Sequence, residues 1–375
     1  MIDCAAFYDA LIARGLCFYT GVPDSLLQEL CACIEDRADA DSHILAANEG
    51  NAVALAAGHY LATGSPAVVY MQNSGEGNAV NPLTSLMDPL VYGIPALLII
   101  GWRGEPGTTD EPQHRKQGEI TLTLLEALGI DHAILPDDPG AATATLDTAL
   151  AAMQRRPGPY ALVVRKGTFE KYGRRKPEPV HGMTREQAVE AVAAAAGPRD
   201  VIVSTTGKAS RELYEYRVSQ GADHSGRDFL TVGSMGHASQ IALGIARSQR
   251  GREVICLDGD GALIMHMGAL AIIGKHAPAN FSHVVVNNGA HDSVGGQATA
   301  GFGIDIPAIA LACGYRSASR VGSHATLNSE MTALLASQGP ALLEVQVDPG
   351  SRPDLGRPAS SPGQNKDRLM AFLRS

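Results

Sequence analysis

The stretch from Glu253 to Gly296 constrains the fold of this chain more than any other. An apolar run, Val254 to Leu257, ends in Asp-Gly-Asp-Gly, and a helical pattern follows from Ala262 to Gly274. A second apolar run, Val284 to Val286, ends in Asn-Asn-Gly. This order of strand, glycine turn, helix and strand predicts a βαβ unit, whose parallel strands point their carboxyl ends to one edge of a sheet.

The polar turns of this unit predict a magnesium diphosphate site. Gly259 and Gly261 let backbone N–H groups approach an anion, and the helix that opens at Ala262 directs its positive end to the same place. Asp260 adds a carboxylate and Asn288 an amide oxygen. Mg²⁺ prefers oxygen ligands and is usually held by one or two carboxylates together with phosphates.

Two simpler explanations of Asp-Gly-Asp-Gly are a calcium loop and a structural glycine turn. A calcium loop needs further oxygen ligands and a terminal glutamate, whereas Ala, Leu, Ile, Met and His follow Gly261. A structural turn explains Gly-Asp-Gly alone equally well. It does not explain why Asn287-Asn288 follows the next strand, so the pair of motifs is the more specific signal.

This pair of motifs resembles the signature of thiamine diphosphate enzymes. The resemblance implies that Asp260, the side chain of Asn288 and the backbone carbonyl of Ala290 bind Mg²⁺. It also implies that Gly259, Gly261 and Ala262 contact the diphosphate of the cofactor.

Apolar runs alternate with helical patterns along the whole chain and predict an α/β fold with two doubly wound parallel-sheet domains. We place the first domain at 1–167, an exposed linker at 168–183 and the second domain at 184–375, with no central third domain. The expected strands lie near residues 17–19, 44–47, 67–71, 96–100, 133–135, 160–165, 201–204, 229–232, 254–257, 283–286, 315–318 and 341–347. Helices are expected at 3–14, 24–36, 49–63, 76–87, 119–128 and 140–154 in the first domain.

Composition narrows the class of partner. The net charge is −9 and no long basic run occurs, so we expect no nucleic-acid binding. No apolar run reaches the length of a membrane span, and the N-terminus lacks the pattern of a signal peptide, so we expect no membrane association. The six cysteines form no CxxC pair, which is typical of reduced thiols, and we expect a cytoplasmic protein.

Glu49 stands where an expected strand gives way to an alanine-rich helix. From the residues alone it could merely cap that helix. The segment around it is similar to the cofactor-activating segment of thiamine diphosphate enzymes, which implies that Glu49 binds the aminopyrimidine ring and activates the cofactor.

Two further turns are expected at the same edge of the second sheet. Thr206, Gly207 and Lys208 could reach a diphosphate with hydroxyl, N–H and ammonium groups. Ser234 and Met235 lie in a glycine turn, and Met235 could be an ordinary core residue. The resemblance instead implies that this turn contacts the cofactor and that Met235 wedges between its two rings.

The compact two-domain arrangement is similar to that of phosphonopyruvate and sulfopyruvate decarboxylases. Stretches that carry the resemblance are 20–30, 68–86, 101–118, 204–213 and 287–297. They imply non-oxidative decarboxylation of 3-phosphonopyruvate, with sulfopyruvate or another small anionic 2-oxo acid as the alternative substrate. Two departures are Glu76, where an apolar residue is expected, and Asp292, where a glutamate is usual.

An anionic substrate needs basic groups, and the segment from Trp102 to Gly118 is our candidate loop, with Arg103, His114 and Lys116 as substrate ligands. It could also be an ordinary solvated loop. Asp24 and His291 are candidate proton relays or turn caps. The resemblance further implies a homodimer or larger homo-oligomer with active sites at the subunit interface.

Two other classes of function remain to be weighed. An NAD-dependent dehydrogenase would need Gly-x-Gly-x-x-Gly after the first strand, and only Gly21 is present there. A non-catalytic scaffold of the same fold should have lost Glu49 or Asp260, and both are present. An enzyme is therefore the better hypothesis.

Overall fold

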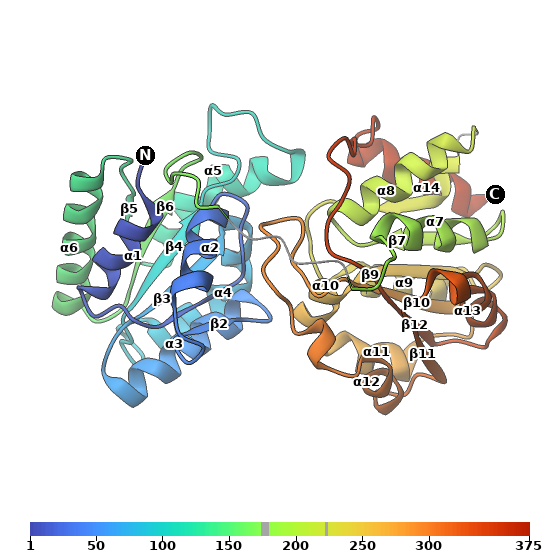
Figure 1. Cartoon of the computed structure of the whole chain (residues 1–375), viewed down its shortest axis with the longest axis horizontal. Coiled ribbons are helices and arrows are strands. Elements are labelled where there is room, and N and C mark those ends of the chain that lie inside the picture. Colours follow the sequence, from blue (N-terminus) through green and yellow to red (C-terminus); the bar gives the residue numbers. More distant parts are fainter. Residues whose placement is uncertain (174–179, 222–223) are drawn as a thin grey trace. The chain divides into compact units, whose positions relative to one another are not determined.

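Each half of the chain forms a six-stranded parallel sheet with helices on both faces (Figure 1). The computed structural model describes residues 1–173, 180–221 and 224–375. Two units divide the chain, Met1–Lys176 and Pro177–Ser375. The expected fold class, with two doubly wound domains and no third domain, is confirmed.

All twelve expected strands are present. In the first unit they are β1 (Tyr19–Gly21), β2 (His43–Leu45), β3 (Ala67–Gln72), β4 (Ala96–Gly101), β5 (Asp131–Ile134) and β6 (Pro159–Val164). In the second they are β7 (Val201–Ser204), β8 (Asp228–Leu230), β9 (Val254–Gly259), β10 (Phe281–Asn287), β11 (Ser317–Val321) and β12 (Ala341–Gln346).

The strand order is β2-β1-β3-β4-β6-β5 in the first sheet and β11-β12-β10-β9-β7-β8 in the second. Strands paired in register bring residues of distant sequence together; His283 of β10, for example, lies opposite Cys256 of β9. Because every pair is parallel, all carboxyl ends of one sheet lie along one edge.

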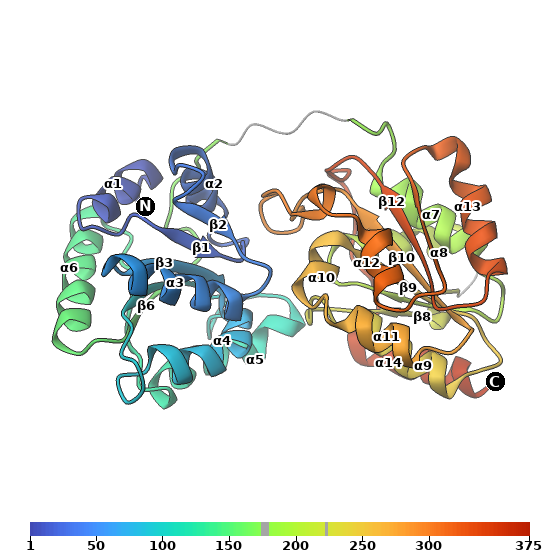
Figure 2. The ribbon, with the colours of Figure 1, turned by 90° about the horizontal axis from the view of Figure 1, so that it is seen from below.

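Helices cover the two faces of each sheet (Figure 2). The first unit contains α1 (Cys4–Ile12), α2 (Gln28–Arg37), α3 (Glu49–Thr63), α4 (Glu76–Pro82), α5 (Pro112–Ala127) and α6 (Pro139–Arg155). The second contains α7 (Arg185–Ala195), α8 (Lys208–Ser219), α9 (Ala238–Ser248), α10 (Asp260–Met265), α11 (Ala269–His276), α12 (Ile306–Ala312), α13 (His324–Ala336) and α14 (Pro362–Arg374).

Each sheet is buried on both faces, as its continuous apolar strands predict. In β4 the alternating residues Leu97 and Ile99 pack with α1, α2 and α6, whereas Leu98 and Ile100 pack with α3, α4 and α5. The second sheet repeats the pattern, with α7, α8 and α13 on one face and α9, α11, α12 and α14 on the other.

Two expected elements differ from the structure. The helix expected at 119–128 begins at Pro112, about two turns earlier, because proline is favoured at the first helical position. The helix expected at 262–274 is interrupted between Met265 and Ala269 and forms α10 and α11.

The described ends of the expected linker, 168–183, pack against the two units. Phe169 is buried in the first core, and Ile2 exchanges backbone hydrogen bonds with Thr168 and Glu170. Met183 is buried in the second core. Residues 174–179 of this segment lie outside the described residues.

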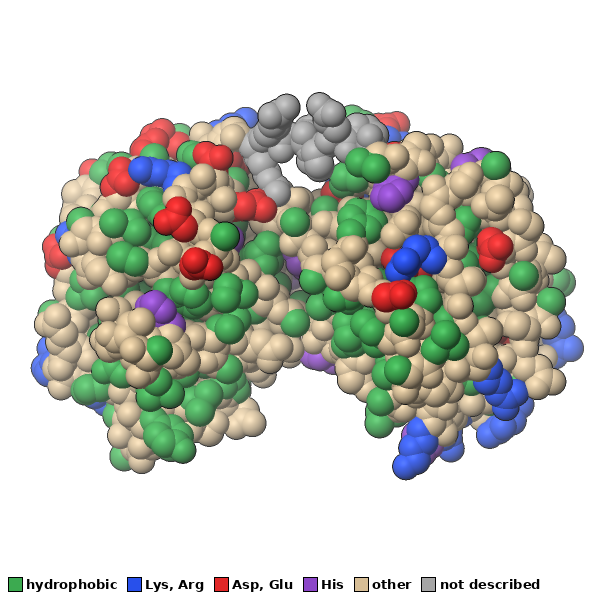
Figure 3. All heavy atoms as spheres, turned by 60° about the horizontal axis from the view of Figure 1, so that its bottom comes forward, with side chains coloured by type: hydrophobic (Ala, Val, Ile, Leu, Met, Phe, Trp, Pro, Cys, Tyr) green, Lys and Arg blue, Asp and Glu red, His purple; other side chains and the backbone are tan. Residues whose placement is uncertain are grey.

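Apolar side chains also reach the surface of the first unit, as the green side chains on the face drawn in Figure 3 show. Exposed ones include Leu61, Leu90, Val91 and Tyr92. Within the described part of the chain, no helix has the length and apolar character that crossing a membrane requires.

Candidate active site

The predicted residues of the second unit follow four neighbouring strands. Thr206, Gly207 and Lys208 follow β7, Ser234 and Met235 follow β8, Asp260 follows β9, and Asn288 follows β10. These strands are adjacent in the order β10-β9-β7-β8. The topology therefore brings all four turns to one edge of the second sheet.

Asp260 is the first residue of α10 and is 2% exposed. Its carboxylate accepts hydrogen bonds from the hydroxyl of Thr299 and from the backbone N–H of Asn288. Burial raises the pKa of Asp260 to about 6, although these hydrogen bonds act in the opposite direction. Among the side chains that the structure describes, no cation pairs with Asp260. A bound cation would supply the missing charge.

Asn288 lies directly after β10 with its side chain buried and held at both ends. Its Oδ1 accepts a hydrogen bond from the N–H of Ala290 at 3.1 Å, and its Nδ2 donates to Oδ2 of Asp292 at 2.7 Å. Oδ1 has a second lone pair. A carboxylate, an amide oxygen and nearby backbone carbonyls form an oxygen donor set, which fits Mg²⁺.

The turn after β7 is shaped for a close approach of backbone to a ligand or neighbour. Gly207 has φ +97°, and a Cβ there would lie 2.7 Å from the hydroxyl of Ser293. Burial lowers the pKa of Lys208, whereas the nearby charge of Asp292 raises it. Lys208 and the loop after Asn288 are thus neighbours, as expected of two segments that bind one anion.

The turn after β8 is joined to the turn after β7. The N–H of Gly233 donates to the hydroxyl of Thr206 at 2.9 Å. Ser234 has φ +47° and is the only residue other than glycine with positive φ in the described ranges. Non-glycine residues adopt this conformation rarely, often at functional sites. Met235 beside it is half-buried.

His291 lies against the Gly-Asp-Gly turn, because a Cβ at Gly261 would lie 3.0 Å from its Cε1. Burial lowers the pKa of His291 to about 4, so the imidazole is neutral near pH 7. A neutral ring can accept a proton at one nitrogen and donate at the other. The candidate proton relay therefore lies against Gly261, the residue after Asp260.

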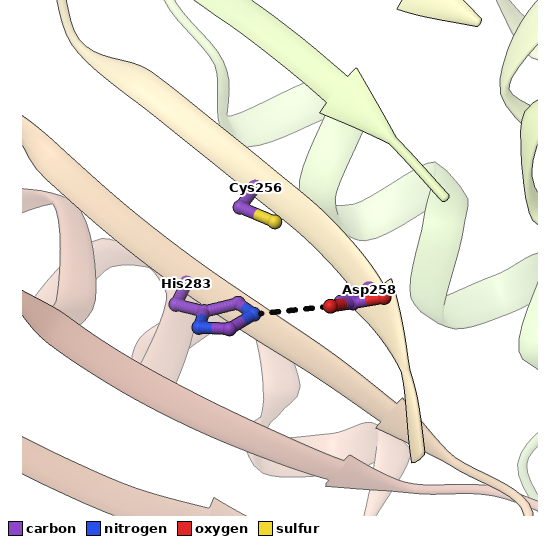
Figure 4. Close-up of side chains that lie close together, drawn as sticks. All are labelled: Cys256, Asp258 and His283. Atoms are coloured by element: carbon purple, nitrogen blue, oxygen red, sulfur yellow. Dashed lines mark ion pairs between the residues drawn. The ribbon is translucent and has the colours of Figure 1, made fainter. Parts of the chain in front are cut away.

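A second polar cluster lies inside the sheet, one residue before the turn (Figure 4). Cys256 and Asp258 of β9 and His283 of β10 are buried and lie on one face, with Nε2 of His283 3.5 Å from Asp258. Asp258 also accepts the N–H of Gly259 at 2.9 Å, and Tyr315 lies 3.0 Å from Nδ1 of His283. These contacts tie the end of β9 to β10.

The first unit gathers its predicted residues in the same way. Asp24 follows β1, Glu49 follows β2, Glu76 follows β3 and Arg103 follows β4. These four strands are neighbours in the order β2-β1-β3-β4. One edge of the first sheet therefore carries three acids and an arginine.

Glu49 is the first residue of α3, but Asn48 caps this helix by accepting the N–H of Asn51. Glu49 is 6% exposed, and its Oε2 accepts a hydrogen bond from Nδ2 of Asn78 at 2.7 Å. Its Oε1 contacts the position that a Cβ of Gly75 would occupy. The capping explanation of Glu49 is thus weakened.

Asp24 is fully buried before α2, and its Oδ2 accepts the N–H of Leu26 at 3.1 Å. Burial raises the pKa of Asp24 to about 6. This contact has the form of a turn cap, while the raised pKa suits a proton relay.

Arg103 is held in a bidentate ion pair with Asp110, at 2.8 and 2.5 Å, and donates to Ser25 at 2.7 Å. Nδ1 of His114 lies 3.0 Å from the same carboxylate. Burial lowers the pKa of His114, although Asp110 opposes this effect. These three residues form one half-buried cluster.

Lys116 is not part of that cluster, since its side chain is 77% exposed and pairs with Glu119. His114 and Lys116 both lie in α5 rather than in a loop, because the helix starts at Pro112. The segment 102–118 is therefore a loop only up to Glu111.

Glu76 is buried at the start of α4 where the sequence resemblance leads one to expect an apolar side chain. Its Oε1 has no hydrogen-bond partner in the described part of the chain. Burial raises the pKa of Glu76 to about 8. The carboxyl group is therefore mostly protonated at neutral pH.

Four polar residues of these sites escaped the sequence analysis: Asn78, Asp110, Thr299 and Arg185. Each acts by holding another side chain, Glu49, Arg103, Asp260 and Asp292 respectively. No local pattern marks such partners. Asn78 and Asp110 lie within stretches that carry the family resemblance, and that location was the one sequence signal that could have pointed to them.

Comparison with known proteins identifies the family of the chain. Residues 4–125 match the N-terminal thiamine pyrophosphate-binding domain of thiamine pyrophosphate enzymes, and residues 205–345 match the C-terminal one. Together these models cover most of the chain. The chain belongs to the thiamine pyrophosphate enzyme family.

Within this family the chain is similar to two curated decarboxylases over its whole length. It is 37% identical to phosphonopyruvate decarboxylase of Streptomyces hygroscopicus, over 99% of this chain and 94% of the relative. It is 38% identical to phosphonopyruvate decarboxylase of Streptomyces viridochromogenes, over 100% of this chain and 95% of the relative. Sulfopyruvate decarboxylase of Methanosarcina acetivorans is 28% identical over 81% of each chain.

Proposed function

We propose that this protein is a phosphonopyruvate decarboxylase that uses thiamine diphosphate and Mg²⁺ and releases CO₂ and phosphonoacetaldehyde, a step of phosphonate and antibiotic biosynthesis. Full-length similarity at 37–38% identity to two phosphonopyruvate decarboxylases supports the substrate. The observation that best supports the metal site is the hydrogen bond from the backbone N–H of Asn288 to the carboxylate of Asp260. It joins a buried carboxylate to the start of an oxygen-rich loop.

The second unit supplies the groups that hold cofactor and metal in this proposal. Asp260, Asn288 and the carbonyl of Ala290 would bind Mg²⁺. Residues that would bind the diphosphate or the rings are Thr206, Gly207, Lys208, Ser234, Met235, Gly259, Gly261 and Ala262. When bound, thiamine diphosphate supplies an electron sink for the loss of CO₂.

The first unit supplies acids and a basic cluster. Glu49 would hold a proton at its carboxylate against the aminopyrimidine ring, with Asn78 fixing its orientation. Asp24 and His291 would move protons. Arg103 and His114 would bind the anionic substrate, with Asp110 holding both in place.

Sulfopyruvate is the second candidate substrate, because relatives named sulfopyruvate decarboxylase match the chain at lower identity. A phosphonate carries close to two negative charges near neutral pH, a sulfonate one and a methyl group none. Charge-assisted hydrogen bonds are worth about 1.5–3 kcal/mol each. Loss of two would cost pyruvate about 3–6 kcal/mol, which is at least a hundredfold in kcat/KM.

The test is CO₂ release from phosphonopyruvate, sulfopyruvate and pyruvate by one preparation with thiamine diphosphate and Mg²⁺. We expect kcat/KM to fall in that order. A higher value for sulfopyruvate would transfer the assignment to sulfopyruvate decarboxylase. No release from any of the three would contradict a decarboxylase of small 2-oxo acids.

We further propose a homo-oligomer in the cytoplasm, of two subunits or more. The exposed apolar residues of the first unit, such as Leu90 and Tyr92, are compatible with association. Sedimentation of the active enzyme measures its subunit number directly, and an active monomer would refute the proposal.

A further inference from the structure

Asp292 is the centre of a hydrogen-bonded cluster in the second unit. Its Oδ2 accepts from Nδ2 of Asn288 at 2.7 Å, from the guanidinium of Arg185 at 2.7 Å and from the N–H of Gly350 at 2.8 Å. One oxygen thus joins three segments, the end of β10, the start of α7 and the chain after β12. Three hydrogen bonds to a single carboxylate oxygen are more than a surface aspartate usually accepts.

Arg185 partly compensates the charge of Asp292, and it pairs with Glu212 as well. Arg185 is 7% exposed, and its Nε and Nη2 bind both oxygens of Glu212 at 2.9 and 2.8 Å. Glu212 is itself buried. Because a guanidinium is planar and its donors are fixed, the bidentate bond to Glu212 leaves Nη1 directed at Asp292.

The cluster determines which way the amide of Asn288 faces. A carboxylate only accepts hydrogen bonds, so the NH₂ group of Asn288 must face Asp292 and its oxygen must face away. The oxygen meets the N–H of Ala290 and keeps a second lone pair. The opposite orientation would set the oxygen of Asn288 against the carboxylate.

We propose that Asp292, anchored by Arg185 and Glu212, is a positioning residue that fixes Asn288 with its amide oxygen turned toward the Mg²⁺ site. The inference rests on the proposed function, since it concerns the same metal site. It also explains how this chain works with an aspartate where the resemblance leads one to expect glutamate. The shorter side chain reaches Asn288 directly, four residues earlier in the same loop.

The experiment measures the Mg²⁺ concentration needed for binding of thiamine diphosphate, followed by calorimetry or near-ultraviolet circular dichroism on the full-length protein. Removal of partners that orient metal ligands typically lowers metal affinity 10- to 100-fold. We expect Asp292→Ala to need about 10- to 100-fold more Mg²⁺. Asp292→Glu, which keeps an acceptor-only group, should recover most of this loss.

A matched control separates positioning from general destabilisation. Arg217 and Asp228 form a buried ion pair elsewhere in the same unit, with 4% and 1% exposed side chains. Arg217→Met should lower the melting temperature of the cofactor-free protein but leave the Mg²⁺ requirement unchanged. If Asp292→Ala does not fold, Asp292→Leu serves, because its side chain has a similar shape but accepts no hydrogen bond from Asn288.

The possible outcomes separate the positioning role of Asp292 from the proposed function. The positioning role alone would be overturned if the wild type binds thiamine diphosphate with Mg²⁺ and the Asp292→Ala or Asp292→Leu variant needs no more Mg²⁺ than the wild type. An equal increase for Arg217→Met would do the same. Wild-type protein that shows no Mg²⁺-dependent binding of thiamine diphosphate would overturn the proposed function and the positioning role with it.

Discussion

The carboxylate of Asp260 accepts a hydrogen bond from the backbone N–H of Asn288, so the ends of β9 and β10 meet at one point. The two residues are separated by α10 and α11 in the chain. Because this contact joins two of the proposed Mg²⁺ ligands, we expect removal of the Asp260 carboxylate to weaken cofactor binding more than removal of any other single carboxylate.

Asp260→Ala should abolish Mg²⁺-dependent binding of thiamine diphosphate, because the diphosphate would face no bridging cation. Calorimetry with Mg²⁺ present measures this directly. Asp367→Ala removes an exposed carboxylate of the same unit, 71% exposed on α14, and should bind the cofactor as the wild type does. Retention of full binding by Asp260→Ala would refute the metal assignment.

Glu49→Gln should slow hydrogen–deuterium exchange at C2 of bound thiamine diphosphate by about 10²-fold or more, the usual contribution of a positioned acid–base group. The amide keeps the shape and the contact with Asn78 but loses the charge. Nuclear magnetic resonance after rapid quenching measures the exchange. An unchanged rate would mean that Glu49 has only a structural role.

Gly75→Ala should have a similar effect on exchange, since its new Cβ would occupy the place of the Glu49 carboxylate. Gly77→Ala is the matched control, because nothing lies within 4 Å of the position of its Cβ. Slower exchange in the control as well would show that both substitutions act by disturbing the start of α4 rather than through Glu49.

Arg103→Met should lower kcat/KM for phosphonopyruvate by at least about tenfold more than for pyruvate. Only phosphonopyruvate has a phosphonate group whose charge Arg103 would bind. Lys116→Met should change neither value by much, since Lys116 is exposed and pairs with Glu119. Steady-state kinetics with both substrates test this difference. Equal losses on both substrates would place Arg103 outside the substrate site.

Glu76 should make stability fall as pH rises. The unfolded carboxyl titrates near about 4.3, and the folded one near about 8 because of burial. Between these pH values the folded protein keeps a proton that the unfolded chain releases, so each pH unit costs up to about 1.4 kcal/mol. Above the folded pKa no further loss arises from this group.

Glu76→Gln removes that titration while keeping the size of the side chain. In urea denaturation of the cofactor-free protein, we expect the variant to gain stability over the wild type at pH 8 but not at pH 5. Asp24 and Asp260, whose pKa values are raised to about 6, titrate in both proteins and cancel in the comparison. An equal difference at both pH values would contradict a raised pKa of Glu76.

The sequence by itself determined the elements, the fold class and the family. Buried parallel strands are continuous apolar runs, and strand, glycine turn and helix recur in a fixed order, so all twelve strands could be located. The residues expected at the diphosphate follow strands of the second sheet and Glu49 follows a strand of the first, so parallel topology alone places each at the carboxyl edge of its own sheet. Local sequence missed the start of α5 and the break between α10 and α11.

Only the tertiary structure decided which side chains hold which. Asp292 meets Arg185 across 107 positions of sequence, and Arg103 meets Ser25 across 78. Such pairs depend on the packing of helices and loops against a sheet, which no local periodicity encodes. The protonation states were also decided by the tertiary structure. Burial raises the pKa of Glu76 and lowers the pKa of His291, and burial is a property of the folded chain that the residue type alone does not reveal.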